Sequence, residues 1–125
     1  MGNNTSTITS FTKLNTWKEG HKLVLSTYQA PKSFPSEERF ALTDQIRRCV
    51  VSVTSNIAEG FSRQSSKEKN QFYYTAKGSL TEIQNQLLIA RDVEYLTQET
   101  FSSLADQTIV VGKLLTGLIK STKKI

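Results

Sequence analysis

Apolar residues recur every three or four positions along four stretches of this chain, which is the spacing of one face of an α-helix. The clearest stretch spans residues 42–62, where the stripe consists of Leu42, Ile46, Val50, Val53, Ile57 and Phe61. The same spacing runs through residues 13–29, 66–95 and 98–122. Each predicted helix carries one apolar face, and another helix must cover that face. The pattern therefore predicts an all-α fold, an antiparallel up-down-up-down four-helix bundle.

The apolar faces of the other three predicted helices can be read in the same way. The first contains Leu14, Trp17, His21, Val24 and Tyr28. The third contains Phe72, Ala76, Leu80, Ile83, Leu87 and Ala90, and the fourth contains Phe101, Leu104, Thr108, Val111, Leu115 and Leu118. We interpret Trp17 and Tyr28 as core residues rather than stacking platforms for bases, and His21 as a residue at the edge of the core.

Capping signals place two of the helix starts. Ser65 and Glu68 fit the capping-box pattern at the start of the third helix, and Thr97 is expected to begin the fourth. Gly78 lies inside the third predicted helix, where a glycine costs about 1 kcal/mol relative to alanine. We interpret Gly78 as a point of close helix packing.

The length and the distribution of polar residues indicate one domain. A chain of 125 residues can build a single core. Residues 1–10 are rich in Asn, Thr and Ser, so we expect a flexible N-terminal arm followed by a bundle over residues 11–125. Pro31 and Pro35 both fall in the connection between the first two helices, where Phe34 and Phe40 are expected to pin the chain to the bundle.

Catalytic and metal-binding patterns are absent from the sequence. Cys49 is the single cysteine and His21 the single histidine, so neither an internal disulfide nor a zinc site with the usual spacing can form. No nucleophile-elbow pattern surrounds a serine, and no glycine-rich loop suits a phosphate. We expect a protein without enzymatic activity and without cofactors. The N-terminus has no signal-peptide pattern and the apolar runs are short, so a cytoplasmic location is expected.

Charge adds a candidate binding site. The net charge is +5 and the isoelectric point about 9.4, a balance that favours polyanionic partners. In an up-down bundle the basic residues of one end come together: Lys13, Arg63, Lys67, Lys69, Lys120, Lys123 and Lys124. Only Glu59 and Glu68 oppose them there, whereas acidic and basic residues alternate at the other end. The simpler alternative is a solvated, lysine-rich end that complements a helix dipole and binds nothing.

The most specific signal is a run of motifs in the middle of the chain. The segment FPSEERFALTDQIRRCVVSVTSNIAEGFSRQSSKE, residues 34–68, is followed by AKGSLTEIQNQLLIA at residues 76–90. Both resemble the small bacterial four-helix-bundle proteins encoded in intervening sequences of 23S ribosomal RNA genes. The same fold family resembles the accessory variability determinants of diversity-generating retroelements. This resemblance implies a basic homopentamer that binds nucleic acid or a reverse transcriptase. Where relatives usually have proline, this chain has Thr54, so we expect its second helix to continue unbroken.

Apolar residues outside the main stripes suggest a second buried face: Val51, Tyr73, Tyr74, Leu88, Ile109 and Val110. We therefore expect self-association. Arg47, Arg48, Asn56 and Glu59 are interpreted as structural or oligomer contacts, with Arg63 as one possible ion-pair partner of Glu59.

Two functions stay open at this point. One is an oligomeric accessory protein that binds RNA or DNA through the phosphate backbone, in a retroelement or in connection with a 23S intervening sequence. The other is an oligomeric scaffold that contacts proteins without binding nucleic acid directly.

Overall fold

The computed structural model describes Ile8 and residues 10–123. The α-helices are α2 (Asn15–Gln29), α3 (Leu42–Ser62), α4 (Ser66–Asp92) and α5 (Gln98–Lys123). Three short 3-10 helices accompany them: η1 (Phe11–Lys13), η2 (Ala30–Ser33) and η3 (Ser36–Glu38). No strand occurs among these described residues. The all-α prediction is confirmed, while most of the predicted N-terminal arm, residues 1–7 and 9, lies outside the described part.

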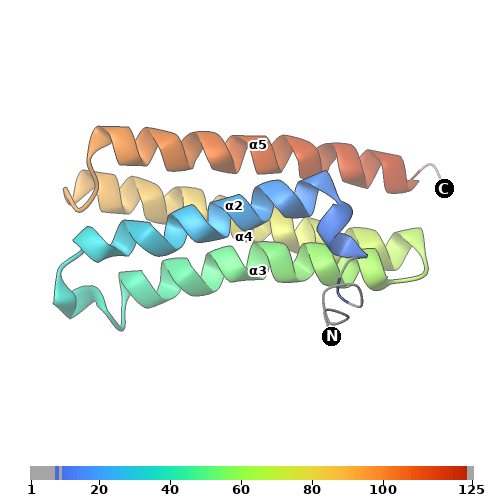
Figure 1. Cartoon of the computed structure of the whole chain (residues 1–125), viewed down its shortest axis with the longest axis horizontal. Helices are drawn as coiled ribbons and strands as arrows, with labels where there is room; N and C mark the ends of the chain where they lie inside the picture. The colour runs from blue at the N-terminus through green and yellow to red at the C-terminus, as the bar shows by residue number, and fades with distance from the viewer. Residues whose placement is uncertain (1–7, 9, 124–125) are drawn as a thin grey trace, which may run out of the picture.

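The four long helices run antiparallel to their neighbours along the length of the molecule (Figure 1). α2 packs against α3 and α5, and α4 packs against the same two helices from the other side. The order around the bundle is therefore α2, α3, α4, α5, which confirms the up-down-up-down arrangement. In this order, the seam between α2 and α3 lies opposite the seam between α4 and α5.

The interior is lined by the predicted stripes of three helices. In α3, Ile46, Val50, Val53 and Ile57 are fully buried. The stripes of α4 and α5 contribute Ala76, Leu80, Ile83, Leu87, Ala90, Leu104, Thr108, Val111 and Leu115, each at most 4% exposed. Burial of one such Leu, Ile or Val side chain stabilises the fold by about 1.5–3 kcal/mol, so these residues supply most of the driving force.

The inward face of α2 differs from the predicted one. Thr16, Gly20, Leu23 and Thr27 are buried there, whereas His21 and Tyr28 are exposed. The reason is close packing on α3, because a Cβ atom at Gly20 would lie 3.1 Å from Cγ2 of Thr54.

The larger side chains of α2 stand at the edge of this contact. Trp17 is half-buried, and the imidazole of His21 stacks on its ring with the centroids 4.7 Å apart. His21 is thus a surface residue that covers an aromatic ring, and the prediction of a position at the edge of the core is wrong.

The connection between α2 and α3 is held by Tyr95 from the α4–α5 connection. The Tyr95 hydroxyl donates to Oε2 of Glu38 at 2.8 Å, and the Ser33 hydroxyl donates to the Tyr95 carbonyl at 2.9 Å. Phe34 is buried against the Tyr95 ring, as expected. Phe40, by contrast, is 84% exposed, so the prediction that it pins the connection is wrong. The polar contacts of Tyr95 hold the connection instead.

The third helix ends earlier than its predicted limit at Tyr95. Glu94 adopts a left-handed conformation with φ of 67°, and the Tyr95 amide bonds back to the Ala90 carbonyl at 2.8 Å. Such a residue stops an α-helix and satisfies its last carbonyls. α5 then starts as predicted, because Oγ1 of Thr97 accepts a hydrogen bond from the Thr100 amide at 3.1 Å.

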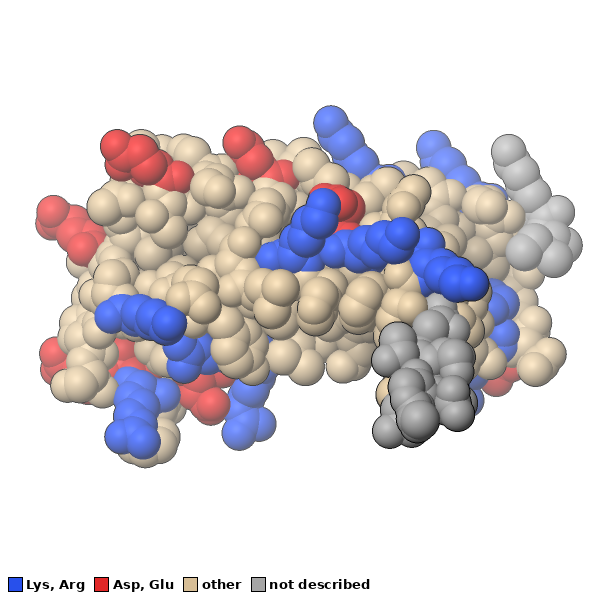
Figure 2. Space-filling model, viewed as in Figure 1, with Lys and Arg blue, Asp and Glu red and all other residues tan. Residues whose placement is uncertain are grey.

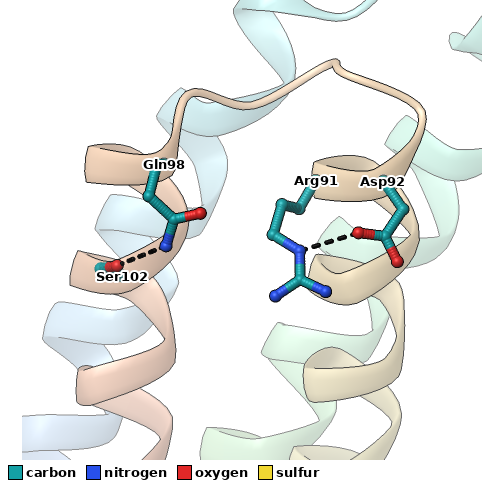
Figure 3. Close-up of polar contacts among 4 residues, drawn as sticks. All are labelled: Arg91, Asp92, Gln98 and Ser102. Atoms are coloured by element: carbon teal, nitrogen blue, oxygen red, sulfur yellow. Dashed lines mark hydrogen bonds and ion pairs between the residues drawn. The ribbon is translucent and has the colours of Figure 1, made fainter.

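Side-chain contacts flank this corner on both helices (Figure 3). On α4, Nε of Arg91 donates to Oδ1 of Asp92 at 2.8 Å. On α5, Nε2 of Gln98 donates to Oγ of Ser102 at 3.0 Å. In the close-up, the Arg91 side chain points from α4 toward the space beside α5.

The other capping and continuity predictions have mixed outcomes. Oγ of Ser65 accepts from the Glu68 amide at 3.1 Å, which confirms the cap of α4. α3 continues through Thr54 as expected, but the Thr54 hydroxyl bonds to the carbonyl of Val51 rather than that of Val50.

Gly78 is exposed, and a Cβ atom added there would meet no atom within 4 Å, so its predicted close packing is wrong. Close packing occurs instead at Gly20 and, most tightly, at Gly60, which faces the Tyr73 ring.

Candidate nucleic-acid interface

The predicted basic residues come together at one end of the bundle. α3 finishes, α4 begins and α5 finishes at this end, and η1 lies beside them (Figure 1). The structure therefore groups the following residues: Lys13, Arg63, Lys67, Lys69, Lys120 and Lys123. Lys124 lies outside the described residues. Figure 2 shows the acidic side chains of the visible face mostly toward the opposite end.

Three of these basic side chains also hold the fold. Nζ of Lys69 donates to the Phe61 carbonyl at 2.7 Å and lies 5.3 Å from the centre of the Phe61 ring. The Arg63 guanidinium packs over Phe72 at 4.7 Å. Nζ of Lys123 donates to the Tyr74 hydroxyl at 3.2 Å. Their charges lie close to the corner between α3 and α4 and to the seam between α4 and α5.

The other three basic side chains at this end are exposed and make no polar contact that stabilises the fold. The ammonium groups of Lys13, Lys67 and Lys120 make no hydrogen bond, ion pair or ring contact with any residue that the structure describes. A ligand phosphate can therefore bind them without breaking a contact that stabilises the bundle. These three lysines are the strongest candidates for direct phosphate contacts.

The two carboxylates at this end neutralise little of the charge. Glu68 accepts a hydrogen bond from the Ser65 hydroxyl at 3.2 Å as part of the helix cap. Glu59 is exposed and forms no ion pair within the described residues. The considered pair between Glu59 and Arg63 is not formed, because the Arg63 guanidinium stacks on Phe72 instead.

A shallow groove extends the basic end along the seam between α4 and α5. It is lined by Ser66, Lys67, Asn70, Gln71, Tyr74 and Lys123. Tyr74, at 50% exposure, presents an aromatic ring next to two lysines. The sequence pattern predicts Tyr74 as part of an apolar face. Its separation of seven residues from Lys67 is the signal that both lie on one side of the helix.

Two arginines at the opposite end make contacts within the fold. One guanidinium nitrogen of Arg47 donates to the Tyr28 carbonyl at 2.9 Å, and the group lies 5.2 Å from the centre of the Tyr28 ring. Arg47 thus ties the end of α2 to α3. Arg48 forms an exposed ion pair with Asp44 at 2.9 Å. Asn56 donates to the Ser52 carbonyl at 2.8 Å within α3, which is a structural contact.

The single cysteine and the single histidine have different surroundings. Burial, with a contribution from the charge of Glu82, raises the pKa of the Cys49 thiol to about 11. The thiol donates to the Ser79 carbonyl at 3.1 Å in the interior. His21 is stacked on Trp17 at the surface. Within the described part of the chain, no three His, Cys, Asp or Glu side chains are grouped so as to hold a metal ion.

A membrane-spanning helix must be both long and apolar. Among the residues that the structure describes, no helix has the length and apolar character needed to cross a bilayer.

These features define the class: a small, basic, antiparallel four-helix bundle whose charge is concentrated at one end. The family model described as 23S rRNA-intervening sequence protein matches residues 12–117. The chain therefore belongs to this family, and the resemblance noted in the sequence is confirmed.

A solved structure supports the fold. It is the crystal structure of a protein of unknown function from the S23 ribosomal protein family of Bacteroides thetaiotaomicron VPI-5482. The two chains are 24% identical and superpose with a TM-score of 0.77, over 84% of this chain and 95% of the other. No curated protein matches the chain.

Proposed function

We propose that this protein is a non-enzymatic, oligomeric accessory protein of the cytoplasm that binds RNA or DNA through the phosphate backbone. The observation that carries the proposal is the set of exposed, uncommitted lysines at one end, Lys13, Lys67 and Lys120. The family's name associates its members with 23S ribosomal RNA, which is consistent with a nucleic-acid partner.

The chemistry of the basic end favours binding that tolerates many sequences. Each lysine that neutralises a phosphate releases condensed counterions, so affinity falls steeply as salt rises. Tyr74 is the one exposed aromatic ring that lines the adjoining groove, which gives little surface for stacking successive bases. Binding should depend on phosphate spacing more than on base identity.

A second candidate function is an oligomeric scaffold for a protein partner, such as a reverse transcriptase. It is favoured by the exposed apolar side chains on three helices, which include Val51, Leu88 and Ile109. Of these, Leu88 and Ile109 line one groove, and uncovered apolar surface is typical of protein contacts. Both functions include self-association, for which the family resemblance implies a pentamer.

The test of nucleic-acid binding compares two sets of lysines. The Lys13→Gln, Lys67→Gln, Lys120→Gln triple variant removes charge from the basic end. The Lys22→Gln, Lys32→Gln, Lys113→Gln variant removes the same charge elsewhere. Fluorescence anisotropy with a labelled RNA and a labelled DNA duplex, over a series of salt concentrations, gives affinity and salt dependence.

Only the first variant should weaken binding strongly. Its slope of log affinity against log salt on duplex DNA should fall by about 2 to 3, because each lost phosphate contact removes about 0.9. Equal effects of the two variants would show that net charge, and not this end, governs binding. Absence of binding by the unmodified protein would refute the nucleic-acid role and favour the scaffold.

Self-association is measured separately by light scattering at micromolar concentration. The expected mass is five times the 14.0 kDa of the chain. A mass of one chain would refute the oligomeric part of both functions.

A further inference from the structure

One apolar surface lies in the seam between α4 and α5. Here a groove is lined by Gln84, Leu87, Leu88, Phe101, Ala105 and Ile109. Leu88 is 42% exposed and Ile109 is 49% exposed, so the groove offers uncovered aliphatic surface. The groove continues toward the middle of the bundle past Lys77 and Lys113, and no acidic residue lines either part.

A single aromatic knob lies on the other side of the molecule. Phe40, at 84% exposure, is the most exposed large apolar side chain among the described residues. Covering such a ring with a partner surface is favourable, because it removes apolar area from water. The Arg39 guanidinium lies over this ring, 5.2 Å from its centre.

The backbone that presents this ring is held firmly. The Glu38 carboxylate accepts hydrogen bonds from the Tyr95 hydroxyl at 2.8 Å and from the Leu42 amide at 3.3 Å. The Ala41 amide donates to the Glu38 carbonyl at 2.9 Å. A ring on a fixed turn loses little conformational freedom when a partner covers it.

The knob and the groove occupy opposite sides of the same end of the bundle. Phe40 lies two residues before α3 in the connection between α2 and α3, and this connection runs past the end of the seam between these two helices (Figure 1). Leu88 lies near the end of α4 and Phe101 near the start of α5, in the opposite seam. One copy can therefore offer its knob to a second copy while its own groove stays free for a third.

From this placement we infer that Phe40 of one copy inserts into the α4–α5 groove of the next copy. The contact specifies the partner in the self-association part of the proposed function, on which it rests. The charges agree in sum: beside the knob the carboxylates of Glu37 and Glu38 outnumber the Arg39 guanidinium, and the continuation of the groove is lined by lysines and no carboxylate. Contacts of this head-to-tail type close into rings or continue as filaments.

The arrangement has a consequence for the basic end. Since the knob and the groove lie at the same end, the copies can stand side by side with their basic ends pointing the same way. Each added copy then contributes another set of free lysines to one surface.

Two variants each remove one half of the contact. Phe40→Ser removes the knob and Ile109→Asp introduces a charge into the groove. Both positions are exposed, so both variants should keep the helicity of the unmodified protein in circular dichroism. Val93→Ser, at a residue that is 51% exposed and lines neither surface, is the matched control.

Sedimentation velocity should find each variant monomeric and the control unchanged. An equimolar mixture of the two variants should form a dimer and nothing larger, because the intact knob of one fits the intact groove of the other. Variants that keep the full assembly, or a mixture that stays monomeric, would overturn the contact while self-association itself stands. A monomeric unmodified protein would refute self-association and this contact together.

Discussion

The ring of Tyr73 lies directly against Gly60, at the corner where α3 ends and α4 begins. A Cβ atom at Gly60 would stand 2.6 Å from Cε1 of Tyr73 and 3.0 Å from the carbonyl oxygen of Lys69. Tyr73 is 1% exposed, so its ring has no free space to move into. The absence of a side chain at residue 60 is what allows the two helices to meet here.

Gly60→Ala should therefore destabilise the protein. Overpacking of a core contact typically costs about 1–3 kcal/mol, which exceeds the roughly 1 kcal/mol of helix propensity that alanine adds. Gly78→Ala is the matched control, because a Cβ at this exposed helical position meets no atom within 4 Å. Urea unfolding should show a lower midpoint for the first variant and a higher one for the second. A stabilised Gly60→Ala variant would contradict the close approach.

Glu94→Gly should stabilise the corner between α4 and α5. Glu94 has a φ of 67°, where the Cβ of an ordinary residue is strained and glycine is not. The expected gain is about 0.5–1 kcal/mol, after allowing for the greater freedom of glycine in the unfolded chain. Glu94→Ala keeps the Cβ and should bring no such gain. Equal midpoints for the two variants in thermal unfolding would contradict the strain at this residue.

Lys69 should contribute to stability as well as to charge. Its ammonium group donates to the Phe61 carbonyl at the end of α3 and lies near the Phe61 ring. Loss of these contacts in Lys69→Gln should cost about 1 kcal/mol. Lys67→Gln, which removes an exposed and uncommitted charge, should unfold at nearly the same urea concentration as the unmodified protein. A binding test at the basic end must therefore treat Lys69 separately.

Cys49 should be unreactive in the folded protein. Its pKa is raised from 9.0 to about 11, first by burial and then by the charge of Glu82, so little thiolate exists near neutral pH. Iodoacetamide at a pH of about 8 should modify the thiol only after unfolding in guanidinium chloride. Rapid modification of the folded protein would show that the thiol is accessible and ionised.

The same pKa shift predicts how stability depends on pH. The thiol loses its proton more easily in the unfolded chain than in the folded one. Its contribution to stability is therefore complete below pH 9.0 and is lost as the pH rises toward about 11. Cys49→Ser, whose hydroxyl does not ionise in this range, should remove this part of the alkaline destabilisation.

Local sequence determined the helices and much of their placement. The stripe of α3 is read from spacing alone, since residues three and four apart always share a face of an α-helix. The Ser65 cap depends on side chains within one turn, so the start of α4 is predictable in the same way. The basic end follows from the alternating direction of four helices, which brings Lys13, Lys67 and Lys120 together whatever the details of packing.

Tertiary packing decided the features that depend on which neighbour a side chain meets. Because Gly20 packs closely on α3, small residues of α2 face that helix. The larger apolar groups of α2, Trp17 and Tyr28, therefore lie outside this contact. Tyr73 is buried because Gly60, thirteen positions away, leaves room for its ring. The spacing of apolar residues predicts which positions are buried but not the shape of the surface opposite them. The sequence therefore determined the four helices, while the tertiary structure decided how closely each pair of helices could approach.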